Sequence, residues 1–88
     1  MIRRRVIVYG HVQGVFFRDT VRRRALADGV AGCVRNTAEG TVEAVFEGSR
    51  EAVERLVAFC REGPRGARVD RVDVVEEPPA GLTGFQVS

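Results

Sequence analysis

The sequence contains no lysine, because all fourteen of its basic residues are arginine. Without lysine the chain has no side-chain amine for a Schiff base and lacks the cation of a P-loop. The net charge is only +2, so the arginines do not make the chain strongly basic. Every cationic role in a binding site therefore falls to arginine, to the single histidine or to the N-terminal amine.

Histidine and cysteine are almost as scarce, with one histidine (His11) and two cysteines (Cys33 and Cys60). One histidine cannot build a histidine-based metal site, and two distant cysteines form neither a metal-binding quartet nor a CxxC redox pair. No spacing among the acidic residues suggests a two-metal site. We therefore expect no metal and no cofactor. We expect two buried thiols, and the sequence leaves a Cys33–Cys60 disulfide open.

Long apolar runs are also absent, since no stretch approaches the ~20 residues that a membrane-spanning helix needs. The arginines near the N-terminus are followed by a short apolar run, residues 6–9, without the small-residue cleavage site of a signal peptide. We therefore expect a cytoplasmic protein with no membrane partner. A chain of 88 residues has the length of one small domain, so we expect a single domain over residues 1–88.

The hydrophobic pattern predicts a β-α-β-β-α-β order with a short strand at the end. Apolar residues recur four apart from Phe17 to Ala25, which predicts a helix over Phe17–Ala27. A second apolar stripe predicts another helix, with Ser49 as its N-cap and Gly63 at its end. The predicted strands cover residues 4–10, 30–36, 41–47, 68–75 and 85–87.

This order is typical of an α+β fold, the ferredoxin-like split βαβ sandwich, in which two helices cover one face of an antiparallel sheet. In the predicted strand 41–47, Val42, Ala44 and Phe46 form one buried face, and the other face is expected to be mostly wet. The strand 30–36 is expected at the edge of the sheet. Glu76 and Glu77 are expected to form a solvated strand end.

The most informative segment is residues 10–18, which run from the end of a strand through a glycine-flanked loop into a helix. Gly14 allows a sharp turn, so the amides from about Gln13 to Arg18 can point inward and bind an anion. Arg18 adds a planar cation and the helix N-terminus adds partial positive charge at the same place. The alternative is an ordinary loop followed by a solvated arginine, and the residues alone leave both open.

Asn36 is the second candidate, at the point where the strand 30–36 meets a turn. Asparagine is common at such positions because it tolerates the left-handed conformation and bonds its own backbone. The functional alternative uses the carboxamide as donor and acceptor to orient a water molecule. Sequence alone does not establish how closely Asn36 approaches the loop.

Stronger catalytic machinery is missing. The residue six positions after Cys33 is Glu39, and the one six after Cys60 is Gly66, so no Cys-x5-Arg phosphatase loop exists. His11, at a strand end, is expected to be structural or solvated rather than a base. An anion receptor without nucleophile or strong base suits a phosphate bonded to a good leaving group, such as a carboxylate.

Residues 10–18, GHVQGVFFR, resemble the G-x-V-Q-G-V-x-F-R signature of the acylphosphatases, and residues 32–36 and 40–43, GCVRN and GTVE, are similar to their second motif. The resemblance covers nearly the whole chain. It implies hydrolysis of acyl phosphates without metal, with Arg18 and Asn36 as catalytic residues. It further implies that the loop binds the phosphoryl group through residues Val12, Gln13, Gly14, Val15, Phe16 and Phe17.

The sequence departs from the family pattern at Cys33, where tryptophan is usual, and at Glu39, where aspartate is usual. Neither position carries the chemistry. We expect a monomer that takes a small acyl phosphate as substrate and binds inorganic phosphate or sulfate.

The rival interpretation is a non-catalytic RNA- or anion-binding module. An RNA-recognition sheet needs exposed aromatic residues, and the strand 41–47 offers only Phe46, so no nucleic-acid partner is expected. A degenerate regulatory domain is a third possibility, against which Arg18 and Asn36 argue.

Overall fold

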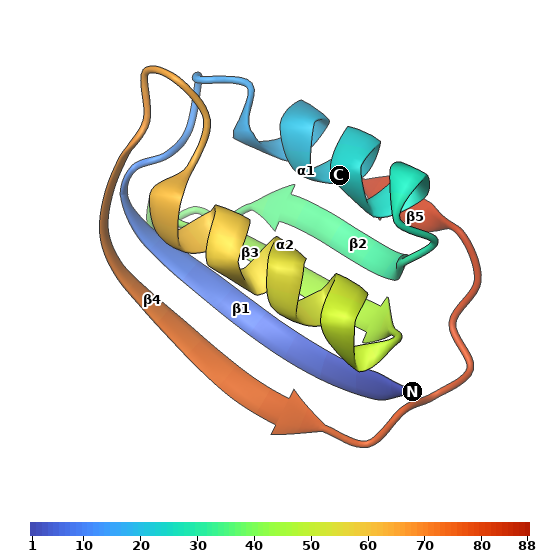
Figure 1. Ribbon diagram of the computed structural model, residues 1–88. Helices are drawn as coiled ribbons and strands as arrows, with labels where there is room; N and C mark the ends of the chain where they lie inside the picture. Colours follow the sequence, from blue (N-terminus) through green and yellow to red (C-terminus); the bar gives the residue numbers. More distant parts are fainter.

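The computed structural model describes residues 1–88, in which two helices cover one face of a five-stranded sheet (Figure 1). Every predicted element is present, and the α+β fold class is confirmed. The strand order across the sheet is β4-β1-β3-β2-β5. The elements are β1 (Ile2–His11), α1 (Phe17–Ala27), β2 (Ala31–Asn36), β3 (Val42–Gly48), α2 (Arg50–Glu62), β4 (Arg68–Glu77) and β5 (Phe85–Val87). No helix has the length and apolar character needed to cross a bilayer.

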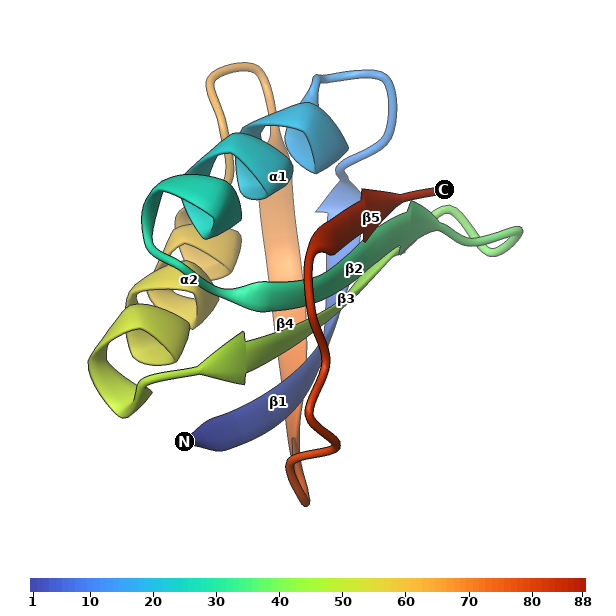
Figure 2. The ribbon, with the colours of Figure 1, turned by 90° about the vertical axis from the view of Figure 1, so that its right-hand side faces the viewer.

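The sheet is mixed rather than wholly antiparallel. Strands β4, β1, β3 and β2 pair antiparallel, but β5 pairs parallel to β2, with Gly32 opposite Phe85 and Val34 opposite Val87. The prediction that β2 forms an edge of the sheet is therefore wrong. The connection after β4 carries the chain across the helix-free face to the opposite edge, where β5 joins (Figure 2).

Helix α1 begins and ends where its apolar spacing predicts. Phe17, Val21 and Ala25 are buried against the sheet, and the arginines at positions 22–24 are exposed. In α2 the predicted cap is also present, because the Ser49 hydroxyl oxygen accepts a hydrogen bond from the Ala52 amide at 3.3 Å. A serine N-cap of this kind contributes about 1 kcal/mol to helix stability. Local sequence therefore predicts both helices, and a side-chain cap marks the start of α2.

The core lies between the helices and the sheet. Phe46, fully buried on β3, stacks on Phe85 of β5 with ring centroids 6.1 Å apart. On the helix side of the core, Leu56 of α2 is also buried. Burial of each such side chain is worth about 1.5–3 kcal/mol. The contact between Phe46 and Phe85 fixes β5 beside β2, where its last residues border the candidate active site.

The helix-free face of β3 is not wet, contrary to the prediction. Val45 is 3% exposed and Glu47 is 2% exposed. The Glu47 carboxylate accepts hydrogen bonds from the amides of Ala80 and Leu82, each at 2.8 Å. The hydrogen bond from Ala80 is the largest cause of a lowered pKa at Glu47, and the bond from Leu82 acts in the same direction. The segment between β4 and β5 covers this face, which local alternation of residues cannot reveal.

Glu77 is a second departure from the prediction of a solvated strand end. Its carboxylate accepts hydrogen bonds from Arg3 Nε at 2.9 Å and from Arg5 Nε at 2.8 Å. The bond from Arg5 is the largest cause of its lowered pKa. The Glu76 side chain is 81% exposed, as expected. The difference arises because Glu77 contacts two arginines, Arg3 and Arg5, whereas Glu76 points to the opposite face of β4 and pairs only with Arg4, at 3.6 Å.

The two cysteines are free, so no disulfide forms. Cys60 is buried, as predicted, and burial raises the pKa of its thiol to about 12. Cys33 is exposed, so the prediction of two buried thiols is wrong at this position. Its neighbour Val34 is buried, and successive side chains of a strand point to opposite faces. Cys33 therefore lies on the helix-free face of β2.

Candidate active site

The loop of residues 12–16 joins β1 to α1. Two glycines shape this connection, Gly10 near the end of β1 and Gly14 within the loop. At Gly10 the chain runs so close to β4 that an added Cβ would lie 2.1 Å from the Arg68 carbonyl oxygen. At Gly14 an added Cβ would meet nothing, but φ is +75°, which side chains other than glycine rarely adopt. The first glycine permits a close approach of strands, and the second turns the loop toward the helix.

The main-chain N–H groups of residues 13–19 donate no hydrogen bond to another backbone group. The amides of a helix's first turn have no partner within the helix, and here the preceding loop adds further free donors. The first bond of α1 runs from the Thr20 amide to the Phe16 carbonyl at 3.0 Å. Free amides at a helix N-terminus, with the helix dipole behind them, form a receptor for an anion.

Arg18 lies in the first turn of α1, where its side chain is partly exposed. Its Nη1 atom donates a hydrogen bond to the main-chain carbonyl of Ser88 at 2.5 Å. This contact directs the guanidinium toward the end of β5. A guanidinium has five donors, so Arg18 keeps others for a ligand.

Asn36 is the last residue of β2 and is partly buried. It lies on the same face of the strand as Val34, which is buried beneath the helices. Its carboxamide forms no hydrogen bond with another protein group. One donor group and one acceptor are therefore free on the side of the sheet that α1 occupies.

A pocket of about 430 Å³ brings these parts together. Arg18 and Asn36, which are far apart in the sequence, both border it, beside the loop and the end of β5. Its lining residues are Val12, Gly14, Phe16, Phe17, Arg18, Asp19, Arg22, Asn36 and Val87. The residues that the two sequence motifs nominate therefore share one cavity, with cationic and amide groups on its walls.

Two of the predicted loop residues do not line this pocket. The Val15 side chain borders a second hollow between the helices, and the Gln13 side chain points to the β2–β3 turn. For both residues the prediction concerned the main-chain amide, which is free. His11 is exposed and does not line the pocket either.

Gln13 has a side-chain role that the sequence did not indicate. Its Nε2 atom donates to the carbonyl oxygens of Thr37 at 2.9 Å and Thr41 at 3.0 Å. The hydroxyls of these two threonines are 2.6 Å apart and hydrogen-bonded. The loop is thereby joined to the turn that follows Asn36. No local pattern predicts a contact between residues 24 positions apart.

Arg22 is exposed and also borders the pocket. It lies four residues after Arg18 on α1, so the two side chains share one face of the helix. This four-residue spacing could have predicted that Arg22 lies beside Arg18 at the pocket. The pocket therefore has two arginines on one wall and a single carboxylate, Asp19.

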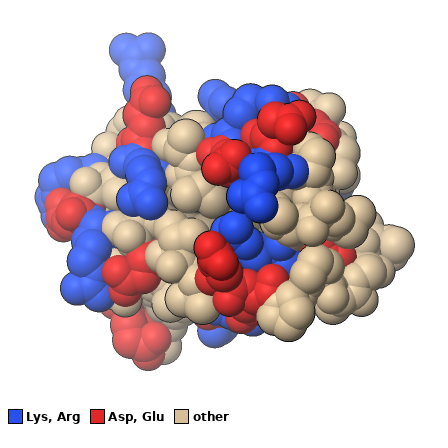
Figure 3. Space-filling model, turned by 60° about the horizontal axis from the view of Figure 1, so that its bottom comes forward, with Lys and Arg blue, Asp and Glu red and all other residues tan.

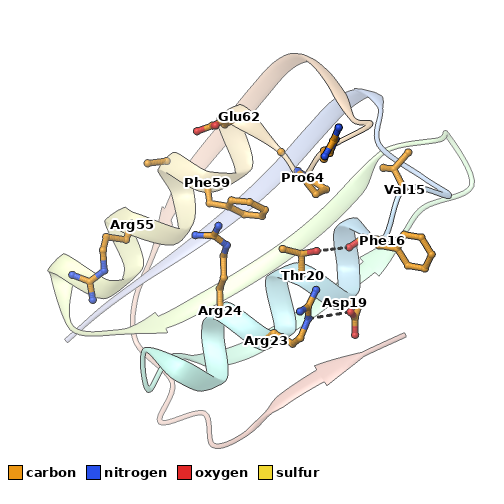
Figure 4. Close-up of a pocket in the computed structure, with 13 residues that line it drawn as sticks. Val15, Phe16, Asp19, Thr20, Arg23, Arg24, Arg55, Phe59, Glu62 and Pro64 are labelled. Atoms are coloured by element: carbon orange, nitrogen blue, oxygen red, sulfur yellow. Dashed lines mark hydrogen bonds and ion pairs between the residues drawn. The ribbon is translucent and has the colours of Figure 1, made fainter.

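A second, more open hollow of about 850 Å³ lies between α1 and α2, and we call it the interhelix groove (Figure 4). It is larger than the pocket but contains neither Arg18 nor Asn36. Elsewhere, no group of three or more His, Cys, Asp and Glu side chains is placed to hold a metal ion. The smaller pocket is the candidate active site because the free amides and the two nominated side chains meet there.

Comparison with known proteins identifies the family. A sequence model of the acylphosphatase family matches residues 4–87. The chain belongs to the acylphosphatase family. It is 58% identical to an acylphosphatase of Rubrobacter xylanophilus, a match covering 94% of this chain and 76% of the relative. It is 52% identical to an acylphosphatase of Gloeobacter violaceus, over 98% of this chain and 92% of the relative.

The fold agrees with acylphosphatases of known structure. The crystal structure of acylphosphatase from Bacillus subtilis matches with a TM-score of 0.94 at 34% identity, covering 100% of this chain and 99% of the other. An acylphosphatase from Coxiella burnetii matches with a TM-score of 0.93 at 37% identity, covering 99% of this chain and 92% of the other. The chain is therefore an acylphosphatase enzyme, whose substrate is a small-molecule acyl phosphate.

Proposed function

We propose that residues 1–88 form one acylphosphatase domain and that the 430 Å³ pocket is its active site. The observation that carries the proposal is the meeting of Arg18, Asn36 and the free amides of residues 13–19 around one cavity. The pocket contains every group that the proposal requires, so a monomer suffices as the functional unit. Free thiols on Cys33 and Cys60 fit a reducing compartment and so support a cytoplasmic location.

In this proposal the loop binds the phosphoryl group of the substrate. The amides of residues 13–19 donate to its oxygens, and Arg18 adds a charge-assisted, planar pair of donors. Phosphoryl transfer passes through a loose transition state whose charge is spread over these oxygens. Fixed donors aimed at that charge stabilise the transition state without having to reorganise. Inorganic phosphate or sulfate, which has the same tetrahedral shape, is expected to bind there too.

Asn36 is assigned to the attacking water. Its carboxamide oxygen accepts a hydrogen bond from the water and holds the water in line with the bond to be broken. The bond from the water oxygen to phosphorus forms as the bond from phosphorus to the acyl oxygen breaks. The carboxylate leaves with the electron pair, and the proton of the water passes to a phosphoryl oxygen to give dihydrogen phosphate.

No strong base is needed, because a carboxylate is a stable leaving group whose conjugate acid has a pKa of about 4.3. The exposed position of His11 outside the pocket supports a mechanism without it. The RNA-binding alternative draws no support from β3, where Phe46 is fully buried. On the side of the molecule shown in Figure 3, acidic and basic side chains are interspersed rather than gathered into a basic track.

The proposal is tested by measuring phosphate release from benzoyl phosphate, acetyl phosphate and p-nitrophenyl phosphate, each with and without EDTA. We expect release from both acyl phosphates, unchanged by EDTA, and little from p-nitrophenyl phosphate, whose leaving group is poorer. Turnover of the acyl phosphates at the background rate would overturn the proposal. Filter binding to single-stranded RNA, run in parallel, tests the alternative.

A further inference from the structure

Phe16 has an unusual backbone conformation at the start of α1. Its φ is 60° and its ψ is 26°, and it is the only residue other than glycine with a positive φ. For a bulky side chain the left-handed region is a true outlier, with a cost that glycine would not incur. Such strain persists where the surrounding structure imposes it, and it is concentrated at functional sites.

The Phe16 side chain does not pack in the hydrophobic core. Its ring is 80% exposed, and the residue caps the helix without a side-chain hydrogen bond. The main-chain carbonyl of Phe16 stabilises the first turn of α1, because it accepts hydrogen bonds from the Thr20 amide at 3.0 Å and the Thr20 hydroxyl at 2.8 Å. Glycine would form the same main-chain bonds without strain and without an exposed aromatic ring. The exposed ring is therefore available to contact a ligand.

The ring lies where the acyl end of a bound substrate would emerge. Phe16 lines both the active-site pocket and the interhelix groove. Figure 4 shows the ring turned away from the helix pair, at the edge of the groove. A phosphoryl group held by Arg18 and the loop amides leaves its acyl group to extend toward the mouth of the pocket. The face of the Phe16 ring is then within reach of that group.

The groove beside Phe16 favours an apolar acyl group over a charged one. Most of its arginines are already engaged: Arg23 pairs with Asp19 at 3.1 Å, Arg55 pairs with Asp28 at 3.5 Å, and Arg24 stacks on Phe59 at 4.1 Å from the ring centroid. Arg65 and Glu62 line the groove as well, and the apolar side chains on its walls besides Phe16 include Val15, Phe59 and Pro64.

We propose that Phe16 is a specificity-determining contact for the acyl group and that it favours flat, aromatic acyl phosphates over acetyl phosphate. This inference rests on the proposed function, because it requires the phosphoryl group to occupy the Arg18 pocket. An aromatic acyl group can stack on the ring and cover its exposed face, whereas a methyl group is too small to do so.

The test compares kcat/KM for benzoyl phosphate with kcat/KM for acetyl phosphate in five proteins. These are the wild type, Phe16→Gly, Phe16→Asn, Phe16→Tyr and Leu26→Ala. Glycine and asparagine accept the left-handed backbone, so the loop keeps its shape while the ring is lost. Tyrosine keeps the ring. Leu26 is another exposed apolar residue of α1 but lies outside both hollows.

We expect the benzoyl-to-acetyl ratio to fall about threefold to tenfold in the glycine and asparagine variants, the value of one aromatic contact. The tyrosine and Leu26→Ala variants should stay within about twofold of wild type. The thermal unfolding midpoint of Phe16→Gly should equal or exceed that of wild type, because the strain is relieved.

An unchanged ratio in both Phe16→Gly and Phe16→Asn, in a wild-type background that hydrolyses both substrates, would overturn this inference alone. Wild-type protein that hydrolyses neither acyl phosphate would overturn the proposed function as well. The intrinsic reactivities of the two substrates differ, but that difference is the same for every variant and cancels in the comparison.

Discussion

Gln13 and Thr37 join the two halves of the proposed active site. The side-chain amide of Gln13, in the loop before α1, donates a hydrogen bond to the main-chain carbonyl of Thr37 at 2.9 Å. Thr37 directly follows Asn36 in the chain. The bond therefore connects the segment proposed to hold the phosphoryl group to the segment proposed to hold the water, and a change at Gln13 should loosen their relative position.

Gln13→Leu should lower kcat/KM for benzoyl phosphate roughly tenfold, because small misplacements of reacting groups are costly. The loss of two hydrogen bonds should also lower the free energy of unfolding by about 1–3 kcal/mol. Steady-state kinetics and urea unfolding measure the two effects. Gln86→Leu is the matched control, since Gln86 is exposed on β5 and does not line the pocket. Equal activity in the two variants would contradict the positioning role.

Arg18→Ala should lower kcat/KM by at least about 100-fold, as the loss of a preorganised donor at a transition-state charge commonly does. Both KM and kcat should change, because Arg18 is proposed to bind the phosphoryl group in the substrate and in the transition state. Arg18→Lys should recover only part of the activity, since an ammonium lacks the planar fork. Arg50→Ala, exposed at the start of α2, is the control. A wild-type rate in Arg18→Ala would refute the assignment.

Asn36→Ala should act mainly on kcat. Water positioning matters on the reaction path rather than in substrate binding, so kcat should fall by about 100-fold while KM stays within about twofold. Cys33→Ala changes an exposed side chain on the opposite face of the same strand and should leave both constants unchanged. A rise in KM with unchanged kcat would show that Asn36 binds substrate instead.

Stability should depend on pH through Glu47. The Ala80 amide, first among the causes, lowers the pKa of this carboxyl, so the folded protein binds the proton less readily than the unfolded chain. The resulting stability is complete above the ordinary pKa of glutamate, about 4.3, and is lost as the pH falls through the lower folded value. Glu77 has a lowered pKa as well and contributes in the same direction.

Glu47→Gln should therefore lower the thermal unfolding midpoint by about 5–10 °C near neutral pH, and the difference from wild type should shrink below about pH 4. Circular dichroism melts across a pH series measure both. Glu76→Gln, whose side chain is 81% exposed, should match the wild type at each pH. A difference between wild type and Glu47→Gln that persists undiminished in acid would contradict the role of the ionised carboxylate.

Local sequence predicted the elements but not the connections between distant parts of the chain. The helix Phe17–Ala27 could be predicted to the residue because its apolar spacing and its ends are local. The burial of Glu47 could not, because it depends on a segment about thirty-three positions away that crosses the sheet. The same limit explains the wrong edge position of β2, since the place of β5 depends on that crossing.

The candidate site shows the same division. Its motifs nominated Arg18 and Asn36, and the free amides follow from a loop that enters a helix. The distance between the two side chains, the bonds of Gln13 and the contact of Arg18 with Ser88 depend on tertiary structure. Among the pocket residues that the motifs did not nominate, Arg22 could have been inferred locally, because it lies four positions after Arg18 on the same helix.

The most direct test of the account is an NMR titration of the protein with inorganic phosphate, followed in nitrogen–proton correlation spectra. The account predicts that the amides of residues 13–19 and the side-chain NH₂ of Asn36 shift together with one dissociation constant, and that Arg18→Ala abolishes the shifts. Shifts confined to the arginines of the interhelix groove, or undiminished in Arg18→Ala, would contradict it.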